Sequence, residues 1–301
     1  MRSYFKIYEQ IFHQPTLSLY DISEKTHISR NTVSSYLHDM YDDGMLMGPQ
    51  IRLIPTTNYR EYVYLLRFKN PFQVFEGLRG FPHILYHAMT FGDWNIMAIT
   101  NRLLDFSQLV GFESVVRQGR RGYTYTPKVQ HLTWEHAVKK ADTYVLDFSP
   151  QREEYSSRRI GPPLTWRRKE WALYHAFKMN IRKKATPILR KLRIRYETYS
   201  RWMETLKIHT TVHVGYYPDG YEKYLSYCFL LSSDYEESVH TIFSFLPSTP
   251  YIIEYGNHLL VFANVISSKI SRNLFCTLYD MKRKGIIKGC NQAVVVFHCV
   301  H

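Results

Sequence analysis

The sequence predicts an α+β protein made of two tandem units, each a winged helix-turn-helix followed by a βαββαβ ferredoxin-like domain. Three observations predict this class. Amphipathic helical patterns with tight connections fill the N-terminal part of the chain. Alternating strand and helix patterns follow them directly. The same order of patterns then recurs when the chain is aligned with itself so that Ile22 falls on Ile188, which indicates an internal duplication.

The first unit opens with three helical patterns. "RSYFKIYEQIF" gathers its apolar residues on one face, as a surface helix does. Ser18 and Asp21 have the spacing of a capping box, so we expect a second helix to begin there. Ser29 caps the third helix, which runs to Gly44. Two extended segments around Gly48-Pro49 predict a β-hairpin wing, so residues 1–58 form winged helix-turn-helix 1.

The outward face of the third helix is typical of a helix that reads DNA in the major groove. Arginine can bond guanine and asparagine can bond adenine with two hydrogen bonds each, while small serines allow close approach. The expected DNA contacts on this face are Arg30, Asn31, Ser34, Ser35 and His38. The alternative is a solvated helix face that binds nothing.

A second winged helix-turn-helix is predicted at residues 166–220. The alignment that places Ile22 on Ile188 also places Ile28 on Ile194, so the buried pattern is repeated. Thr186-Pro187 predicts the start of its middle helix. "WRRKEWALYHAFKM" supplies the helix before it, and "HTTVHVGYYPDGYEKYL" supplies a wing with a "PDG" turn.

The positive charge is concentrated in this second copy. The chain carries a formal net charge of +13, and residues 152–209 alone carry sixteen basic and five acidic residues, a net +11. Such a segment predicts an anionic partner, double-stranded DNA, with the second copy supplying phosphate contacts and the first more of the base reading. The expected contacts are Arg182, Lys183, Lys184, Arg190, Arg193, Arg195, Tyr196 and Arg201. The alternative is a basic face that only solubilises the domain.

A ferredoxin-like block follows each winged helix, at residues 59–135 and 221–301. The first block reads as strand, helix, two strands joined by "FGDWN", the helix "FSQLVGFESVVRQG" and the strand "YTYTPKVQHL". The second repeats this order, so we expect one antiparallel sheet per block. Residues 136–165, which end in "GPPLT", are predicted to be a linker.

Several function classes have little support in the sequence. The four cysteines form no CxxC pair, and His83 with His87 (like His209 with His213) lies in an expected strand, where the pair is separated by roughly 13 Å. We therefore expect no metal and no cofactor. No nucleophile and base stand out, so we expect no enzyme. The chain has no signal-peptide pattern and no apolar run near ~20 residues, so we expect a cytoplasmic protein without a membrane partner.

The segments "ISEKTHISRNTVSSYLHDMYDDGML" and "ILRKLRIRYETYSRWMETL", each followed by a βαββαβ order with a Gly-containing turn, resemble the Lrp/AsnC family of transcriptional regulators. The resemblance covers nearly the whole chain, twice. It implies RAM-type effector domains that pair through their sheets, here within one chain as a pseudo-dimer that could also form a homodimer. It also implies a small effector, such as an amino acid, at the turns Gly92, Asp93, Gly256 and Asn257.

The function predicted from these features is a sequence-specific DNA-binding transcriptional regulator. Two alternatives stay open. Siroheme decarboxylases use the same fold, and "RRIG" at Arg158 is similar to an arginine motif of those enzymes, so a tetrapyrrole-binding protein is the first alternative. A protein-interaction module on the same fold is the second.

Overall fold

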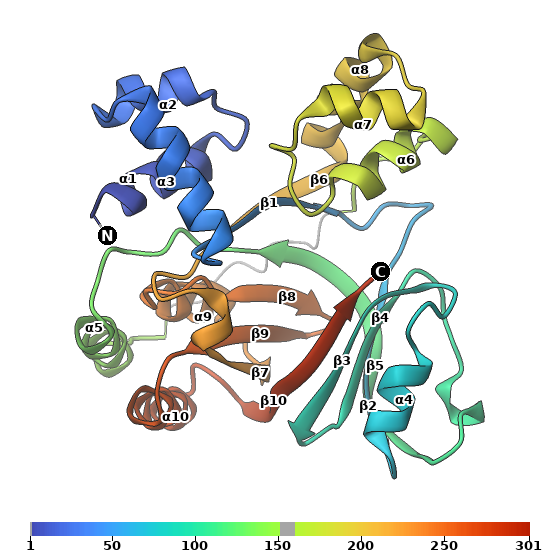
Figure 1. The fold of residues 1–301 in the computed structure, drawn as a ribbon. Coiled ribbons are helices and arrows are strands. Elements are labelled where there is room, and N and C mark those ends of the chain that lie inside the picture. The colour runs from blue at the N-terminus through green and yellow to red at the C-terminus, as the bar shows by residue number, and fades with distance from the viewer. Residues whose placement is uncertain (1, 151–159) are drawn as a thin grey trace.

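Two helical lobes stand on one side of a β-barrel in the computed structural model, which describes residues 2–150 and 160–301 (Figure 1). The chain runs through the first lobe and half of the barrel, and then through the second lobe and the other half. The predicted α+β class is confirmed by this mixture of helices and sheet. Among the described residues, no helix combines the length and apolar character needed to cross a membrane.

The first lobe consists of α1 (Arg2–His13), α2 (Leu19–Thr26) and α3 (Arg30–Asp42). The Ser18 hydroxyl accepts a hydrogen bond from the Asp21 backbone N–H, and the Asp21 carboxylate accepts one from the Ser18 N–H. Ser29 accepts from the Thr32 N–H in the same way at the start of α3. Both predicted helix starts are therefore confirmed, and each satisfies backbone donors that a helix leaves unpaired.

The second lobe repeats the first at the level of single residues. It consists of α6 (Arg168–Phe177), α7 (Ala185–Leu192) and α8 (Tyr196–His209), and the alignment of Ile22 with Ile188 matches the first residue of each to that of α1, α2 or α3. The same alignment matches His27 to Arg193, and both have left-handed backbones, with φ of 56° and 54°. The predicted start, with Thr186 as the cap and Pro187 as the first helical residue, is two residues late: α7 begins at Ala185, after Lys184, without a side-chain cap.

The two wings are not hairpins, which corrects the prediction. Each is one strand, β1 (Leu46–Leu53) or β6 (Thr210–Tyr216), and the two pair antiparallel with each other. This ribbon connects the lobes. β1 pairs with β6 because each strand buries apolar side chains in the lobe of the other half. β6 places Val214 and Tyr216 in the core of the first lobe, and β1 places Ile51 and Leu53 in the core of the second. Each lobe is completed by a strand from the other half of the chain.

Below the ribbon, strands of both halves close into one barrel, where we had predicted two separate sheets. In the described residues the order around it is β10-β3-β4-β2-β5-β8-β9-β7, and every pair is antiparallel. The closing pairs, β3 with β10 and β5 with β8, join the halves. The strands are β2 (Tyr62–Phe68), β3 (Ile84–Gly92), β4 (Ile96–Thr100), β5 (Phe112–Tyr125), β7 (Leu225–Ser232), β8 (Tyr251–Tyr255), β9 (His258–Val265) and β10 (Gly289–Val300).

One helix of the first block is missing from the described structure. The segment 106–119 that we predicted as helical forms a short 3₁₀ turn, η1 (Phe106–Gln108), and then the first part of β5. Gly111 has φ of +78°, which ends helical backbone, and the β-branched Val115 and Val116 favour a strand. The expected strand at 123–132 contributes only as far as Tyr125.

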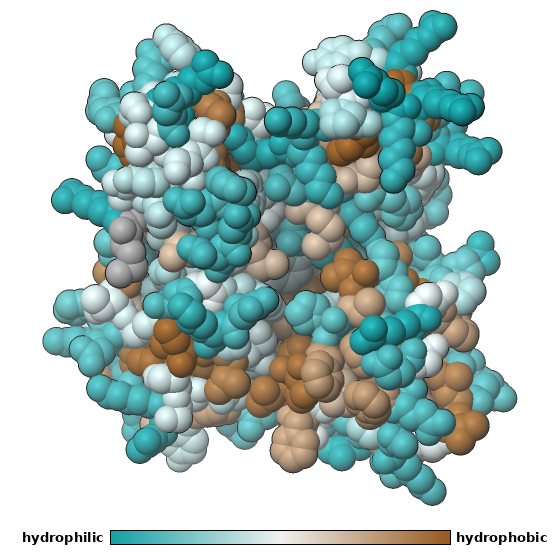
Figure 2. Space-filling view, in the orientation of Figure 1, coloured by the Kyte–Doolittle hydropathy of each residue, from teal (hydrophilic) through white to brown (hydrophobic). Residues whose placement is uncertain are grey.

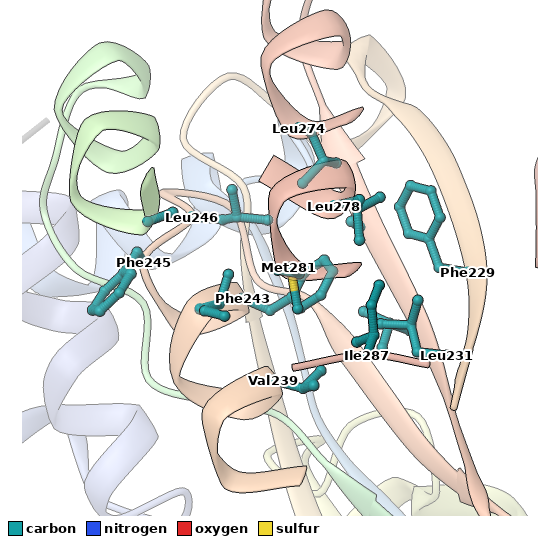
Figure 3. Packing of buried hydrophobic residues seen from close by; sticks show 14 of the residues in the cluster. Phe229, Leu231, Val239, Phe243, Phe245, Leu246, Leu274, Leu278, Met281 and Ile287 are labelled. Atoms are coloured by element: carbon teal, nitrogen blue, oxygen red, sulfur yellow. The ribbon is translucent and has the colours of Figure 1, made fainter. Parts of the chain in front are cut away.

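Helices cover the outer faces of the barrel unequally. The short α4 (Pro71–Gly77) covers the first half, while α9 (Glu236–Ser244), α10 (Ser268–Arg283) and α5 (Trp134–Leu146) cover the second (Figure 1). Figure 3 shows this packing around Phe243, Leu278 and Met281. Most of α5 lies in the segment 136–165 predicted as a linker, and Arg158 lies outside the described residues.

Candidate functional site

A cavity of about 450 Å³ lies between the mouth of the barrel, the β1–β6 ribbon and helix α6. Figure 2 shows the surface hollowed between the two lobes and the barrel. This volume is in the range of small-molecule and cofactor sites. Residues from both halves line it, because the ribbon and the barrel are each shared between the halves.

Aromatic side chains form much of the cavity wall. Helix α6 contributes Trp171 and Tyr174, which are three residues apart and therefore lie on one helical face. The barrel contributes Tyr86, Tyr251 and Phe262 from strands β3, β8 and β9. Such walls suit a flat, conjugated ligand, which can lie against rings from two sides.

One buried ion pair stabilises the ribbon side of the cavity. Arg121 of β5 places Nη1 2.5 Å from Oε2 of Glu61, and both side chains are almost fully buried. Tyr59 donates its hydroxyl proton to the other Glu61 oxygen at 3.0 Å, and Arg121 also donates to Thr124. Burial alone would lower the pKa of Arg121, but Glu61 and Tyr251 raise it above its usual value. Glu61 is the one acidic residue of the cavity lining in the described chain.

Two further cations belong to the lining: Arg52 of β1 and Lys178, which follows α6. Arg52 donates from Nε to the Tyr251 hydroxyl at 3.2 Å, and Lys178 donates to the backbone oxygen of His301. Burial lowers the pKa of Lys178, and Arg52 lowers it further. The side chains of the lining thus include three cations, Arg52, Arg121 and Lys178, and one carboxylate, Glu61, and this excess of positive charge favours an anionic ligand.

The histidines of the lining differ in availability. His213 is enclosed by Thr126 at 2.6 Å and Thr211 at 2.7 Å, so both its ring nitrogens are occupied. Burial lowers its pKa to about 3, helped by Arg121 and Arg52, and the ring is neutral at neutral pH. His175 and His298 are more exposed at the open side, and burial lowers the pKa of each. These two rings are the ones placed to contact a ligand.

The cations, aromatic side chains and tyrosine hydroxyls of the cavity together favour one kind of ligand. Arginine and lysine groups bind carboxylates, aromatic walls hold a conjugated ring system, and tyrosine hydroxyls donate protons. The pKa of Tyr174 is raised to about 12, mainly by burial and then by Glu61, so this phenol keeps its proton at neutral pH. The cavity therefore suits a large aromatic anion with several carboxylates.

Solved structures of another protein share the overall fold of this chain. The crystal structure of the siroheme decarboxylase NirDL matches 98% of this chain and 91% of its own, with a TM-score of 0.51 and 11% sequence identity. The fold is shared with a siroheme decarboxylase. A second structure of NirDL, in co-complex with an iron-uroporphyrin III analogue, matches 98% of this chain and 92% of its own at 10% identity, with a TM-score of 0.42. No protein-family model and no curated protein matches the sequence.

The similarity to NirDL corrects one expectation. We expected no enzyme, because no nucleophile and base stand out in the sequence, but the protein that shares this fold is a decarboxylase. Decarboxylation needs neither a nucleophile nor a paired base, so our sequence criterion does not detect this kind of site.

The residues predicted to read DNA lie on the lobes, away from the cavity lining. All five on α3 are exposed, and Nδ1 of His38 lies 3.3 Å from the Asp42 carboxylate. On the second lobe the predicted cations are exposed apart from Arg182, and Arg201 pairs with Glu197 at 3.5 Å. Figure 2 shows strongly hydrophilic side chains over this lobe. DNA contact by these residues stays a prediction.

Arg182 has an internal role in the structure. Its guanidinium is half-buried and donates to the backbone oxygens of Pro15 at 3.0 Å and Leu17 at 2.7 Å. Those two residues belong to the loop before α2, so Arg182 connects the second lobe to the first. Because these bonds occupy one end of the guanidinium, this residue differs from the other predicted phosphate contacts.

The predicted effector turns lie at the two strand pairs that close the barrel. Asp93 accepts hydrogen bonds from the Gln292 N–H at 2.8 Å and from Asn291 at 3.1 Å, across the β3–β10 pair. A Cβ on Gly92 would come within 2.4 Å of the Gln292 oxygen, so glycine is required for this close approach. Gly256 and Asn257 are exposed beside the β5–β8 pair. None of the four lines the cavity, and an effector there stays a prediction.

Sequence reasoning missed the cavity residues Arg52, Arg121, Trp171, Tyr174 and Lys178. The spacing in "EWALYHAFK" places Trp171, Tyr174 and Lys178 on one helical face, and this was an available signal. We had predicted that segment only as the first helix of the second winged helix-turn-helix. Arg52 and Arg121 gave no signal, because their approach depends on the exchange of β1 and β6 and on closure of the barrel.

Proposed function

We propose that this chain binds a carboxylate-bearing iron tetrapyrrole, of which siroheme is the leading candidate, in the cavity and removes carboxyl groups from it. The observation that carries the proposal is the position of two cations, Arg52 and Lys178, within aromatic walls. The fold shared with a siroheme decarboxylase supports the same substrate class. The iron belongs to the substrate in this proposal, and His175 or His298 is placed to meet it.

We also interpret each half as a winged helix-turn-helix followed by a ferredoxin-like domain. The helix and strand order of each lobe with its barrel half supports this interpretation, as does the strand order β3-β4-β2-β5 in one half and β8-β9-β7-β10 in the other. Under this interpretation α6 of the second lobe and the β1–β6 ribbon cover the barrel mouth. The winged helices then serve as walls of a substrate site.

The proposed step is a proton-for-carboxyl exchange. The bond between the carboxylate carbon and the adjacent side-chain carbon breaks, CO₂ leaves, and the electron pair remains on that carbon, conjugated with the macrocycle. A proton from a neutral donor, for which Tyr174 is the candidate, then forms the new C–H bond. Arg52 and Lys178 hold other carboxylates and so fix which group lies among the aromatic side chains, where loss of charge is favoured.

The test is a titration of the purified chain with siroheme, followed by visible absorbance, and mass spectrometry of the pigment after anaerobic incubation. We expect a saturable spectral change and products that have lost one or more CO₂ groups. A spectral change without loss of CO₂ would support tetrapyrrole binding but would overturn the proposed decarboxylase activity. No spectral change, together with salt-dependent binding of duplex DNA, would overturn the proposal in favour of the transcription regulator.

A further inference from the structure

Three potential metal ligands meet outside the cavity, where β3 and β10 join the two halves of the barrel. His87 of β3 lies directly opposite Cys299 of β10 in the antiparallel register. His301 is two residues beyond Cys299, and its N–H extends the ladder by donating to the Leu85 oxygen at 3.0 Å. Since side chains alternate between the faces of a sheet, all three lie on the same face.

The donor atoms already point toward one another. His87 Nδ1 lies 2.9 Å from His301 Nε2, and the Cys299 Sγ lies within 4.8 Å of a ring nitrogen of each histidine. The other nitrogen of His87, Nε2, lies 3.0 Å from the backbone oxygen of Phe75. A carbonyl oxygen can only accept, so Nε2 carries the proton and Nδ1 presents its lone pair to the cluster. A backbone carbonyl that orients a histidine in this way is a common outer partner in metal sites.

We propose that His87 Nδ1, His301 Nε2 and Cys299 Sγ form a binding site for a divalent transition metal of the zinc class. Two imidazoles and one thiolate suit this class, and water could complete a tetrahedron. In such a site the two nitrogens are ~3.3 Å apart, because each lies about 2.0–2.1 Å from the ion. From their separation of 2.9 Å, the rings need to move apart by only a few tenths of an ångström.

The site differs from the histidine pairs considered in the sequence. There His87 was matched with His83, four residues away on the same strand. Here its partners come from β10, in the other half of the chain, and only barrel closure brings them together. His301 also accepts a hydrogen bond from Lys178 through its backbone oxygen, so a bound ion would fix the end of β10 beneath one wall of the cavity.

The experiment uses the full chain after treatment with a chelator and dialysis, in the absence of any tetrapyrrole. Titration with Co²⁺ is followed by absorbance, since thiolate-bound tetrahedral Co²⁺ has an intense charge-transfer band. We expect one equivalent of Co²⁺ to give this band and Zn²⁺ to displace it. Cys299→Ser should remove the band, and His301→Gln should weaken Co²⁺ binding by at least about tenfold.

The matched control is Cys276→Ser, because Cys276 is an exposed cysteine on α10 that is outside the cluster. It should leave the titration unchanged. We avoid replacing His87, which is fully buried and could be needed for folding, and circular dichroism of each variant checks the fold. Absence of a thiolate band in the parent chain, or an unchanged band in Cys299→Ser, overturns the proposal. Because no tetrapyrrole is present, this result is independent of the proposed decarboxylation.

Discussion

Arg52 keeps its positive charge inside the cavity wall because of its neighbours. Burial would lower its pKa, but Tyr251, Tyr174 and Glu61 together raise it above the usual value. Its one hydrogen bond to a protein side chain in the described structure goes from Nε to Tyr251, so the outer guanidinium nitrogens form no hydrogen bond to a described side chain. A carboxylate would find two parallel donors there.

Arg52→Gln should therefore weaken siroheme binding by about tenfold or more, since it removes a charge-assisted hydrogen bond. The measurement is the same absorbance titration used for the parent chain. Arg102→Gln is the matched control, because Arg102 is exposed and does not line the cavity. Equal affinities of the Arg52 and Arg102 variants would show that Arg52 does not hold the ligand.

The ion pair of Arg121 and Glu61 should matter for stability. Glu61→Gln leaves the Arg121 guanidinium buried without its carboxylate, and loss of one partner of a buried pair costs about 3 kcal/mol of unfolding free energy. Urea unfolding measures this cost. Glu76→Gln breaks an exposed pair with Arg79 and should cost below about 1 kcal/mol. Similar costs for both variants would contradict the role of burial.

His213 predicts a loss of stability in acid. Its pKa is about 3 in the folded chain because of burial and the nearby Arg121 and Arg52, against an ordinary value of 6.5. As the pH falls below 6.5, the unfolded chain binds a proton that the folded chain excludes, so stability decreases until about pH 3. Between pH 7 and 4.5 the expected decrease from this group is about 2–3 kcal/mol.

The variant His213→Asn tests this contribution, because asparagine does not titrate and can still bond Thr126 or Thr211. Its unfolding free energy should depend less on pH than that of the parent chain, by the same amount of about 2–3 kcal/mol. Parallel pH profiles for the two proteins would show that His213 is not the group responsible.

At the scale of elements, the two lobes share helix starts but not capping chemistry. Ser29 caps α3 with a hydrogen bond from Thr32, whereas Arg195 at the equivalent start of α8 offers no side-chain acceptor. Arg195→Ser should add the missing bond and stabilise the chain by about 0.5–1 kcal/mol, and Ser29→Ala should cost about 1 kcal/mol. Thermal unfolding of both variants measures whether each substitution raises or lowers stability. A destabilised Arg195→Ser variant would contradict the capping argument.

The helix starts of the first lobe could be predicted because capping is local: Ser18, Asp21 and Ser29 act on backbone groups close to them in the sequence. The wings and the segment 106–119 could not, because their partners lie far away along the chain. Val115 is in a strand because β5 pairs with β2 and then β8, contacts that no local pattern contains. The cavity was missed for the same reason, since Arg52 and Trp171 meet only after β1 reaches the second lobe.

At the scale of the whole molecule, the exchanged strands make each lobe dependent on the other half. Ile51 lies in β1 but is buried in the core of the second lobe. Ile51→Ala should cost about 2–4 kcal/mol and accelerate hydrogen exchange in α6 and α8, with little effect on α2 and α3. Val214→Ala, on β6, should do the reverse. Faster hydrogen exchange in α2 of the Ile51→Ala variant would contradict the conclusion that β1 completes the core of the second lobe.

The internal duplication also has a consequence for stoichiometry and for divergence between the two copies. In the alignment of the two halves, Trp171, Tyr174 and Lys178 of the cavity correspond to Phe5, Tyr8 and Phe12 on α1. There the aromatic side chains pack with Tyr216 in a closed core, and α1 contributes nothing to the cavity lining. A symmetric dimer of single units would carry two equivalent mouths. In this chain the face of α1 that corresponds to the cavity face of α6 is packed against Tyr216, so we expect a single ligand molecule to saturate each chain.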